Sequence, residues 1–284
     1  MRILLTGKNG QVGWELQRAL SSLGEVIVCD RSELDLANPD QIVAVVRETK
    51  PQIIVNAAAY TAVDKAESEP ELAHAINGRA PGILADEAKK LGALLVHYST
   101  DYVFDGTKAG PYTEEDVPNP VSVYGQTKLE GEQAVQNSGC HHLIFRTSWV
   151  YGPRGKNFLL TILRMAKERD EVRIVDDQKG APTSSTLIAH ATAQALRPEN
   201  SGTSGIYHLT AAGTTSWHGF AEAIVSQANL PTKVVPITSA EYPTPAHRPS
   251  NSVLDTSLLQ RRFGIVLEPW QAGLKNCLRT LVSG

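Results

Sequence analysis

The sequence has few of the features that mark membrane, secreted or zinc-binding proteins. Its 284 residues contain no run of about 18 apolar residues, and the apolar stretch after Met1 is too short for a signal-peptide core. The three cysteines, Cys29, Cys140 and Cys277, are far apart and include no Cys-x-x-Cys, which favours a reducing compartment and argues against structural zinc. We therefore expect a cytoplasmic protein with no membrane partner.

Neither positive nor negative charge predominates in the sequence. The formal net charge is −3, charged residues make up 20% of the chain, and no basic block or long charge run occurs. This pattern argues against nucleic acid as the main partner. The eight histidines show no H-E-x-x-H spacing. With 42% hydrophobic residues, the chain can bury a large core, as one large domain or two unequal ones.

Short apolar segments alternate with helical patterns through the first half of the chain. Such alternation predicts a parallel sheet with right-handed crossovers, and hence a doubly wound α/β fold. The first helix is expected to end at about Leu23. The expected strands are Arg2–Thr6, Val26–Cys29, Ile53–Asn56, Leu94–Ser99 and His142–Arg146.

A glycine-rich segment joins the first expected strand to the first expected helix. It reads Gly7-Lys8-Asn9-Gly10-Gln11-Val12-Gly13. Glycines allow a tight turn and let the backbone approach a pyrophosphate, which the amides at a helix N-terminus then bind. The segment therefore predicts a dinucleotide site at the start of the chain.

The ends of the next strands supply further candidates for this site. Asp30 is placed to accept hydrogen bonds from an adenosine ribose, whereas Arg31 beside it suits a 2′-phosphate, so NADH and NADPH both remain open. Asp35 and Leu36 are expected to border the adenine. Small residues at Ala57, Ala58 and Ala59, followed by Tyr60, allow a cofactor to lie close to the backbone.

Tyr124 and Lys128 are the expected catalytic pair. Residues four apart on a helix share one face, and an ammonium near a phenol lowers the phenol pKa. An isolated Tyr-x3-Lys is a weak signal. Here Thr100 leaves the fourth strand at the same edge as the glycine loop, and a hydroxyl there can bond both the phenol and a substrate oxygen. The three residues predict acid–base chemistry on a carbonyl and alcohol pair.

Two later residues are open to two interpretations. Trp149 follows the fifth expected strand and suits either stacking on a sugar or base, or packing in a domain seam. Arg248 lies in the proline-rich segment Tyr242–Pro249 and suits either a bidentate clamp on a diphosphate or an ordinary surface position.

These segments resemble the extended short-chain dehydrogenase/reductases, and within them the dTDP-4-dehydrorhamnose reductase family, over nearly the whole chain. GKNGQVGWEL (7–16) and VYGQTKLEGE (123–132) are shared across the superfamily. More specific are VNAAAYTAVDKAESEPE (55–71), HYSTDYVFDG (97–106), FRTSWVYG (145–152), DQKGAPT (177–183), GTTSWH (213–218) and YPTPAHRPSNS (242–252).

The resemblance implies reduction of the C4 ketone of a dTDP-linked keto sugar by NADPH or NADH. It makes Tyr124 the proton donor and has Lys128 lower its pKa and hold the nicotinamide ribose, while Thr100 tunes the phenol. Asp101 and Trp149 fall at substrate positions, and we add Asn157, Phe158 and Arg248 to that expected site. Cofactor positions implied by the resemblance are Gly10, Gln11, Val12, Asp30, Asp35, Leu36, Ala59, Tyr60 and Thr61.

The expected domains follow from these assignments. Residues 1–150 form an NAD(P)-binding Rossmann domain, to which about 170–212 returns, and 151–169 with about 213–284 form a smaller mixed α/β substrate domain. Some members of the family bind magnesium through glutamates at a dimer interface. Glu15 matches one of these, but a second acidic position reads Ser184-Ser185-Thr186 here, which argues against a magnesium site and leaves monomer and homodimer open.

Two other functions remain as alternatives. Another sugar-nucleotide reductase or epimerase of the superfamily reuses the same tyrosine and lysine. A non-catalytic relative serves as the regulatory subunit of a methionine adenosyltransferase, and such a subunit has no need to retain Thr100, Tyr124 and Lys128 together.

Overall fold

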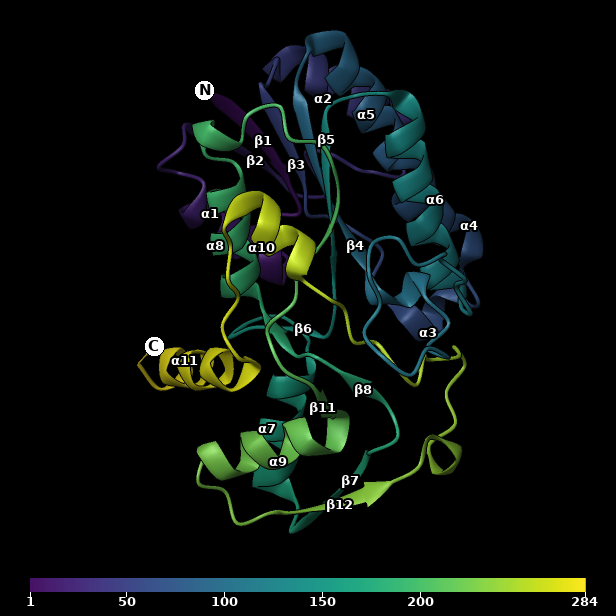
Figure 1. Ribbon diagram of the computed structural model, residues 1–284, viewed down its shortest axis with the longest axis vertical. Coiled ribbons are helices and arrows are strands. Elements are labelled where there is room, and N and C mark those ends of the chain that lie inside the picture. The colour runs from purple at the N-terminus through teal and green to yellow at the C-terminus, as the bar shows by residue number, and fades with distance from the viewer. Residues whose placement is uncertain (284) are drawn as a thin grey trace.

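The computed structural model describes residues 1–283 and is organised around a parallel sheet of six strands (Figure 1). The strand order is β10-β5-β4-β3-β1-β2, and every neighbouring pair runs parallel. The strands are β1 (Arg2–Thr6), β2 (Glu25–Cys29), β3 (Ile53–Asn56), β4 (Leu94–Thr100), β5 (His142–Thr147) and β10 (Gly205–His208). The doubly wound parallel sheet expected from the sequence is confirmed.

Helices cover both faces of this sheet (Figure 1). Leu16, Leu20 and Ile188 belong to the buried cluster on one face, and Ile42, Leu84 and Val135 belong to the cluster on the other. The helices of the first face are α1 (Gln11–Ala19), α8 (Ser185–Ala195) and α10 (Ser257–Phe263); those of the second are α2 (Pro39–Thr49), α5 (Ala80–Leu91) and α6 (Val123–Ser138). Helix α1 ends four residues before the expected Leu23, because the chain turns at Leu20.

Local sequence explains where several of these helices begin and end. Asn38 caps α2 by accepting the amides of Asp40 and Gln41, with Pro39 at the first helical position. Ser122 caps α6 by accepting the amide of Gly125, and Gly139 ends that helix in the left-handed region at φ 69°. The start of α6, and with it the position of Tyr124, is therefore set locally.

Between β3 and α5 the chain is helical but irregular. The segments are α3 (Val63–Ala66), α4 (Pro70–Ala73) and the π-helix η1 (His74–Arg79), followed directly by α5. After β4 a single 3₁₀ turn, η2 (Asp101–Val103), leads into the long loop before α6. These irregular segments surround the end of the sheet where the candidate residues lie.

A second group of elements, the lower lobe, lies at one end of the sheet (Figure 1). It consists of α7 (Phe158–Glu168), β7 (Glu171–Val175), α9 (Trp217–Gln227), β12 (Lys233–Ile237) and α11 (Trp270–Ser283). Its buried cluster includes Leu159, Ile162, Phe220, Ile224 and Leu274. The short strands and turns between the lobe and the sheet are β6 (Val150–Tyr151), β8 (Lys179–Gly180), β9 (Thr183–Ser184), β11 (Thr215–Ser216) and η4 (Ser239–Glu241). The turn η3 (Pro198–Asn200) instead joins α8 to β10.

The segment that returns to the main sheet begins later than the expected residue 170. Strand β7 pairs with β12 in parallel, from Glu171 against Lys233 to Val175 against Ile237, and so belongs to the lower lobe. The return is made by α8, which packs on α1, and by β10, which pairs with β5. The expectation is therefore wrong for β7, whose partner strand lies some sixty residues further along the chain.

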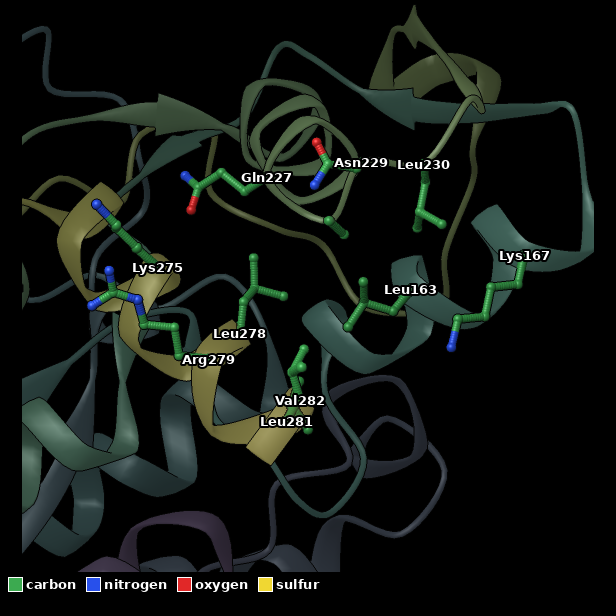
Figure 2. A pocket seen from close by; sticks show the side chains of 11 residues that line it. Leu163, Lys167, Gln227, Asn229, Leu230, Lys275, Leu278, Arg279, Leu281 and Val282 are labelled. Carbon is green, nitrogen blue, oxygen red and sulfur yellow. The ribbon is translucent and has the colours of Figure 1, made fainter. Parts of the chain in front are cut away.

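The lower lobe contains a groove of about 580 Å³ between α7, α9 and α11 (Figure 2). Leu163, Leu230 and Leu278 line its apolar part, with Lys167 and Lys275 nearby (Figure 2). None of the candidate site residues named from the sequence lines this groove. Among residues 1–283, no helix has the length and apolar character needed to cross a membrane.

Candidate active site

The glycine loop between β1 and α1 is shaped by two close backbone approaches. Gly7 has φ +74°, and a Cβ there would stand 2.9 Å from the Ala58 nitrogen. A Cβ at Gly13 would stand 2.1 Å from the Gly7 carbonyl oxygen, a distance that no side chain tolerates. The start of α1 at Gly10 has no side-chain cap and no acidic residue in its first turn. Its amides and the loop therefore suit an anion such as a diphosphate.

The carboxylate expected to meet a ribose lies beside this loop. Asp30 Oδ2 accepts a hydrogen bond from Asn9 at 3.2 Å and lies 3.3 Å from Lys8 Nζ. Hydrogen bonds from Ser32 are the main cause that lowers the pKa of Asp30, so it is ionised at neutral pH. Arg31 is exposed and lies 3.6 Å from Asp35. Two acids, Asp30 and Asp35, thus lie with two cations, Lys8 and Arg31, and this set suits a free ribose as well as a phosphorylated one.

The residues after β3 are fixed close to the glycine loop. Ala58 donates its amide to Thr6 Oγ1 at 3.2 Å. Asn77, from the π-helix η1, accepts the Tyr60 amide at 2.8 Å and donates to the Tyr60 carbonyl at 3.0 Å. The Tyr60 hydroxyl donates to Glu69 at 2.7 Å. Ala57 to Thr61 therefore form a braced wall beside Gly7, whereas Leu36 is buried in the core cluster under α2.

Thr100 and Tyr124 come together at the end of β4. Thr100 is buried and donates to Asp101 Oδ1 at 2.9 Å. The Thr100 hydroxyl also hydrogen-bonds the phenol of Tyr124, on the first turn of α6. The ring of Tyr102 packs edge-on against that of Tyr124, with centroids 5.6 Å apart. The hydroxyl and the phenol predicted from the sequence therefore do meet at one edge of the sheet.

The pKa of Tyr124 departs from the sequence expectation. Burial raises it to about 12, and the Thr100 hydrogen bond opposes that rise only in part. Lys128 does not lower it here, because its ammonium donates to the Tyr98 carbonyl at 2.6 Å and lies 3.4 Å from His97 Nε2. Lys128 is 2% exposed, and burial lowers its own pKa to about 8. The expected effect of the lysine on the phenol is therefore absent from this arrangement.

Asp101 is a buried carboxylate with an unused oxygen. It is 2% exposed, and burial raises its pKa to about 6. Oδ1 accepts from Thr100 and the Ser252 side chain also hydrogen-bonds the carboxylate, while Oδ2 has no donor at hydrogen-bond distance within residues 1–283. A buried acceptor without a donor is costly, and such groups gather at sites that bind a ligand.

Trp149 and Phe158 belong to an aromatic stack at the junction with the lower lobe. Trp149 has φ 49° and stacks on Trp217, with ring centroids 3.6 Å apart and planes 7° apart. The ring centroids of Phe158 and Trp217 are 4.6 Å apart. Gly180 lies under Trp149, because a Cβ there would meet that indole at 2.5 Å. Trp217 was not anticipated from the sequence, since only the fold brings it to Trp149.

Asn157 and Arg248 are each committed to partners within the chain. Asn157 caps α7 through Leu160 and donates to Gln11 Oε1 at 2.9 Å, which ties the lower lobe to the first residue of α1. Arg248 Nη2 pairs with Asp64 Oδ2 at 2.7 Å. No sequence pattern indicated Asp64, which stands at the start of α3, or these two long-range contacts.

No three His, Cys, Asp or Glu side chains within residues 1–283 lie together as a set of metal ligands. Glu15, the residue that matches a magnesium ligand by resemblance, thus belongs to no such group in that range. Ser184, the first residue of the segment 184–186 that stands where the resemblance expects an acid, caps α8 by accepting the amide of Leu187.

These features define a class: an oxidoreductase with a dinucleotide-binding sheet and a tyrosine-centred site at the sheet's edge. A model of the RmlD substrate binding domain family matches residues 1–283. A dTDP-4-dehydrorhamnose reductase from Burkholderia thailandensis is 53% identical, with 100% of both chains covered. One from Escherichia coli K12 is 48% identical over 99% of this chain and 98% of that protein.

Solved structures agree with the sequence comparisons. A dTDP-4-dehydrorhamnose reductase from Clostridium acetobutylicum superposes with a TM-score of 0.95 at 41% identity, covering 99% of this chain and 100% of that one. One from Bacillus anthracis, in complex with NADP, gives 0.94 at 36% identity, covering 98% and 99%. The chain belongs to the RmlD substrate binding domain family, as the resemblance predicted.

Proposed function

We propose that this protein reduces the C4 ketone of dTDP-4-dehydro-β-L-rhamnose to dTDP-β-L-rhamnose, in the cytoplasmic synthesis of this sugar nucleotide. The full-length similarity to reductases of that name supports the substrate. The NADP bound to the Bacillus anthracis relative supports NADPH, and Asp30 beside the glycine loop leaves NADH open. We keep both cofactors, and both monomer and homodimer, in the proposal.

The observation that carries the proposal is the hydrogen bond between the Thr100 hydroxyl and the Tyr124 phenol. It occurs at the edge of the sheet that bears the glycine loop, and the next residue, Asp101 at the start of η2, carries a buried carboxylate oxygen without a donor at hydrogen-bond distance. A proton donor, a hydroxyl that aligns it and a buried acceptor are together suited to a hydroxylated ketone.

The glycine loop fits a dinucleotide, because Gly7 and Gly13 let its backbone close tightly where a Cβ would clash with the Ala58 or Gly7 backbone, and because the α1 amides lack a side-chain cap. Bound NAD(P)H would supply the hydride that reduces C4. The residues proposed to hold it are Gly7, Gly10, Gln11, Val12, Gly13, Asp30, Arg31, Asp35, Leu36, Ala57, Ala58, Ala59, Tyr60, Thr61, Tyr124 and Lys128.

The chain's own part in the reaction is to supply and control a proton. With a pKa near 12, Tyr124 is protonated at neutral pH and can donate its phenolic proton to the C4 oxygen as the ketone becomes an alcohol. On turning from Asp101 Oδ1, the Thr100 hydroxyl would donate to the phenolate that this leaves, whereas the Lys128 ammonium, held by the Tyr98 carbonyl and His97, is assigned to the cofactor. Asp101 Oδ2 is free to accept a hydroxyl of the sugar.

We assign substrate binding to the junction of the sheet edge and the lower lobe. Thr100 and Asp101 would contact the sugar, and Trp149 would offer the edge of its stack with Trp217. Phe158 supports that stack from the lobe. Arg248 would reach the diphosphate only by sharing or leaving Asp64. Asn157 is assigned a bracing role instead, because its amide already bonds Gln11 and the α7 cap.

The test is turnover of dTDP-4-dehydro-L-rhamnose with NADPH and with NADH, each with magnesium or with EDTA. We expect loss of the reduced cofactor and a product heavier than the substrate by two hydrogens, with EDTA having no effect. Stoichiometric NAD retained through purification would favour an epimerase or dehydratase. No turnover of this or other 4-keto sugar nucleotides, with a stable protein partner, would favour the regulatory subunit.

A further inference from the structure

A chain of buried polar side chains runs beneath the proposed site and ends at Lys128. Thr6 Oγ1 donates to Asn56 Oδ1 at 2.7 Å, and Asn56 Nδ2 lies 3.1 Å from His97 Nδ1. His97 Nε2 lies 3.4 Å from Lys128 Nζ. The four side chains come from β1, β3, β4 and α6, and none is more than 2% exposed. Because Thr6 Oγ1 also accepts the Ala58 amide, the chain links the wall beside Gly7 to Lys128.

His97 is the member of this chain that faces Lys128. Burial, with the Lys128 charge as a second cause, lowers the pKa of His97 well below its usual range, so the imidazole is neutral and has one nitrogen free to accept. If Nε2 accepts from Lys128, the proton sits on Nδ1 and needs an acceptor at Asn56. A half turn of the Asn56 amide supplies its oxygen there, and the Thr6 hydroxyl can accept as well as donate.

Lys128 has three N–H donors, of which β4 receives two. The carbonyl of Tyr98 accepts one at 2.6 Å, and the side chain of the preceding residue, His97, lies within reach of another. Two acceptors from adjacent residues fix the direction of the ammonium as well as its position. The third N–H is left for a ligand.

We propose that His97 is a positioning residue: as a neutral imidazole it accepts an N–H of Lys128 and, with the Tyr98 carbonyl, orients the ammonium toward the cofactor. The proposal rests on the proposed function for the role of Lys128, and on the buried contacts for the role of His97. It predicts that turnover depends on an acceptor at the position of Nε2, and that an acceptor at the position of Nδ1 does not replace it.

Two amide variants separate these positions. His97→Gln can place its amide oxygen near the position of Nε2, whereas His97→Asn reaches only that of Nδ1 and keeps the Asn56 contact. For each we would measure the NADPH dissociation constant by fluorescence, kcat, KM and the melting temperature, with Lys128→Met as the reference for complete loss. We expect His97→Asn to weaken NADPH binding and lower kcat by about 10- to 100-fold, the usual effect of losing a hydrogen bond to a charged group. His97→Gln should stay within about threefold of wild type.

A folded His97→Asn protein with wild-type NADPH affinity and kcat would overturn the proposal, as would equal losses in both variants. Unchanged NADPH affinity in Lys128→Met would overturn the cofactor role of that lysine, and with it the proposal. If the wild-type protein binds NADPH but turns over no dTDP-4-keto sugar, the proposed substrate is wrong. The NADPH affinities of the variants still test the positioning role of His97 in that case.

Discussion

Asp64 and Arg248 form an ion pair across 184 residues of chain, with Oδ2 and Nη2 2.7 Å apart. Asp64 Oδ1 also accepts the amide of Ala246 at 3.2 Å, so one carboxylate holds the proline-rich segment Tyr242–Pro249 in two places. Arg248 in turn hydrogen-bonds the side chain of Tyr102, whose ring packs against Tyr124. The proline-rich segment is therefore fastened directly beside the proposed proton donor.

Asp64→Asn should loosen this fastening while leaving the catalytic residues in place. The two side chains are 42% and 22% exposed, so the pair contributes about 1 kcal/mol or less to stability, and the melting temperature should change little. We expect KM for the sugar nucleotide to rise about fivefold with a smaller change in kcat. Steady-state kinetics would check this, with Arg173→Gln as control because it breaks a pair with Glu241 in the lower lobe. An unchanged KM would show that the pair does not hold the substrate site.

Gly13→Ala should damage the cofactor site through backbone packing alone. The added Cβ would stand 2.1 Å from the Gly7 carbonyl oxygen, so the loop and α1 must move apart. Overpacking of this kind costs about 1–3 kcal/mol, and we expect both a lower melting temperature and weaker NADPH binding. Gly110→Ala is the matched control, because nothing lies within 4 Å of its added Cβ. Equal NADPH affinity in the two variants would contradict the assignment of this loop.

The buried carboxylate of Asp101 should make stability depend on pH in an unusual direction. Burial raises its pKa from 3.8 to about 6, so the folded state favours the protonated form. Its favourable contribution is complete below about pH 4 and is lost as the pH rises through 6. Asp101→Asn should therefore stabilise the protein at pH 8, by on the order of 1–3 kcal/mol, and give no gain at pH 4.

Asp105→Asn is the control of opposite sign for that measurement. Hydrogen bonds, first of all from the Thr107 backbone, lower the pKa of Asp105, so its carboxylate stabilises the fold above pH 4 and this contribution is lost in acid. Its asparagine variant should be less stable than wild type at pH 8. Denaturant unfolding at both pH values would compare the two variants, and a destabilised Asp101→Asn at pH 8 would refute the burial argument.

The sheet could be predicted because its signals are local. Buried apolar runs such as Ile53–Asn56, followed by glycines or small residues, identify the strands, and their alternation with helices indicates a parallel sheet with crossover connections. The glycine loop could be identified for the same reason, since Gly7, Gly10 and Gly13 stand between one strand and one helix. The family resemblance added the substrate class, which no local pattern contains.

What the sequence could not supply are contacts between distant segments. The pairing of β7 with β12, the stack of Trp149 on Trp217 and the bond from Asn157 to Gln11 all depend on how the lower lobe sits against the sheet. The same reason explains why the Lys128 ammonium does not lie against the Tyr124 phenol as expected. Helical spacing placed it on one face with Tyr124, but the packing of α6 on β4 offers the ammonium the Tyr98 carbonyl and His97 instead.

The most direct test of the central claim is the kcat of Tyr124→Phe with dTDP-4-dehydro-L-rhamnose and NADPH, beside its affinity for NADPH alone. The variant removes only the hydroxyl that meets Thr100. If Tyr124 donates the proton, kcat falls by about two to four orders of magnitude while the NADPH affinity stays close to that of the wild type. A variant that turns over at nearly the wild-type rate would contradict the account.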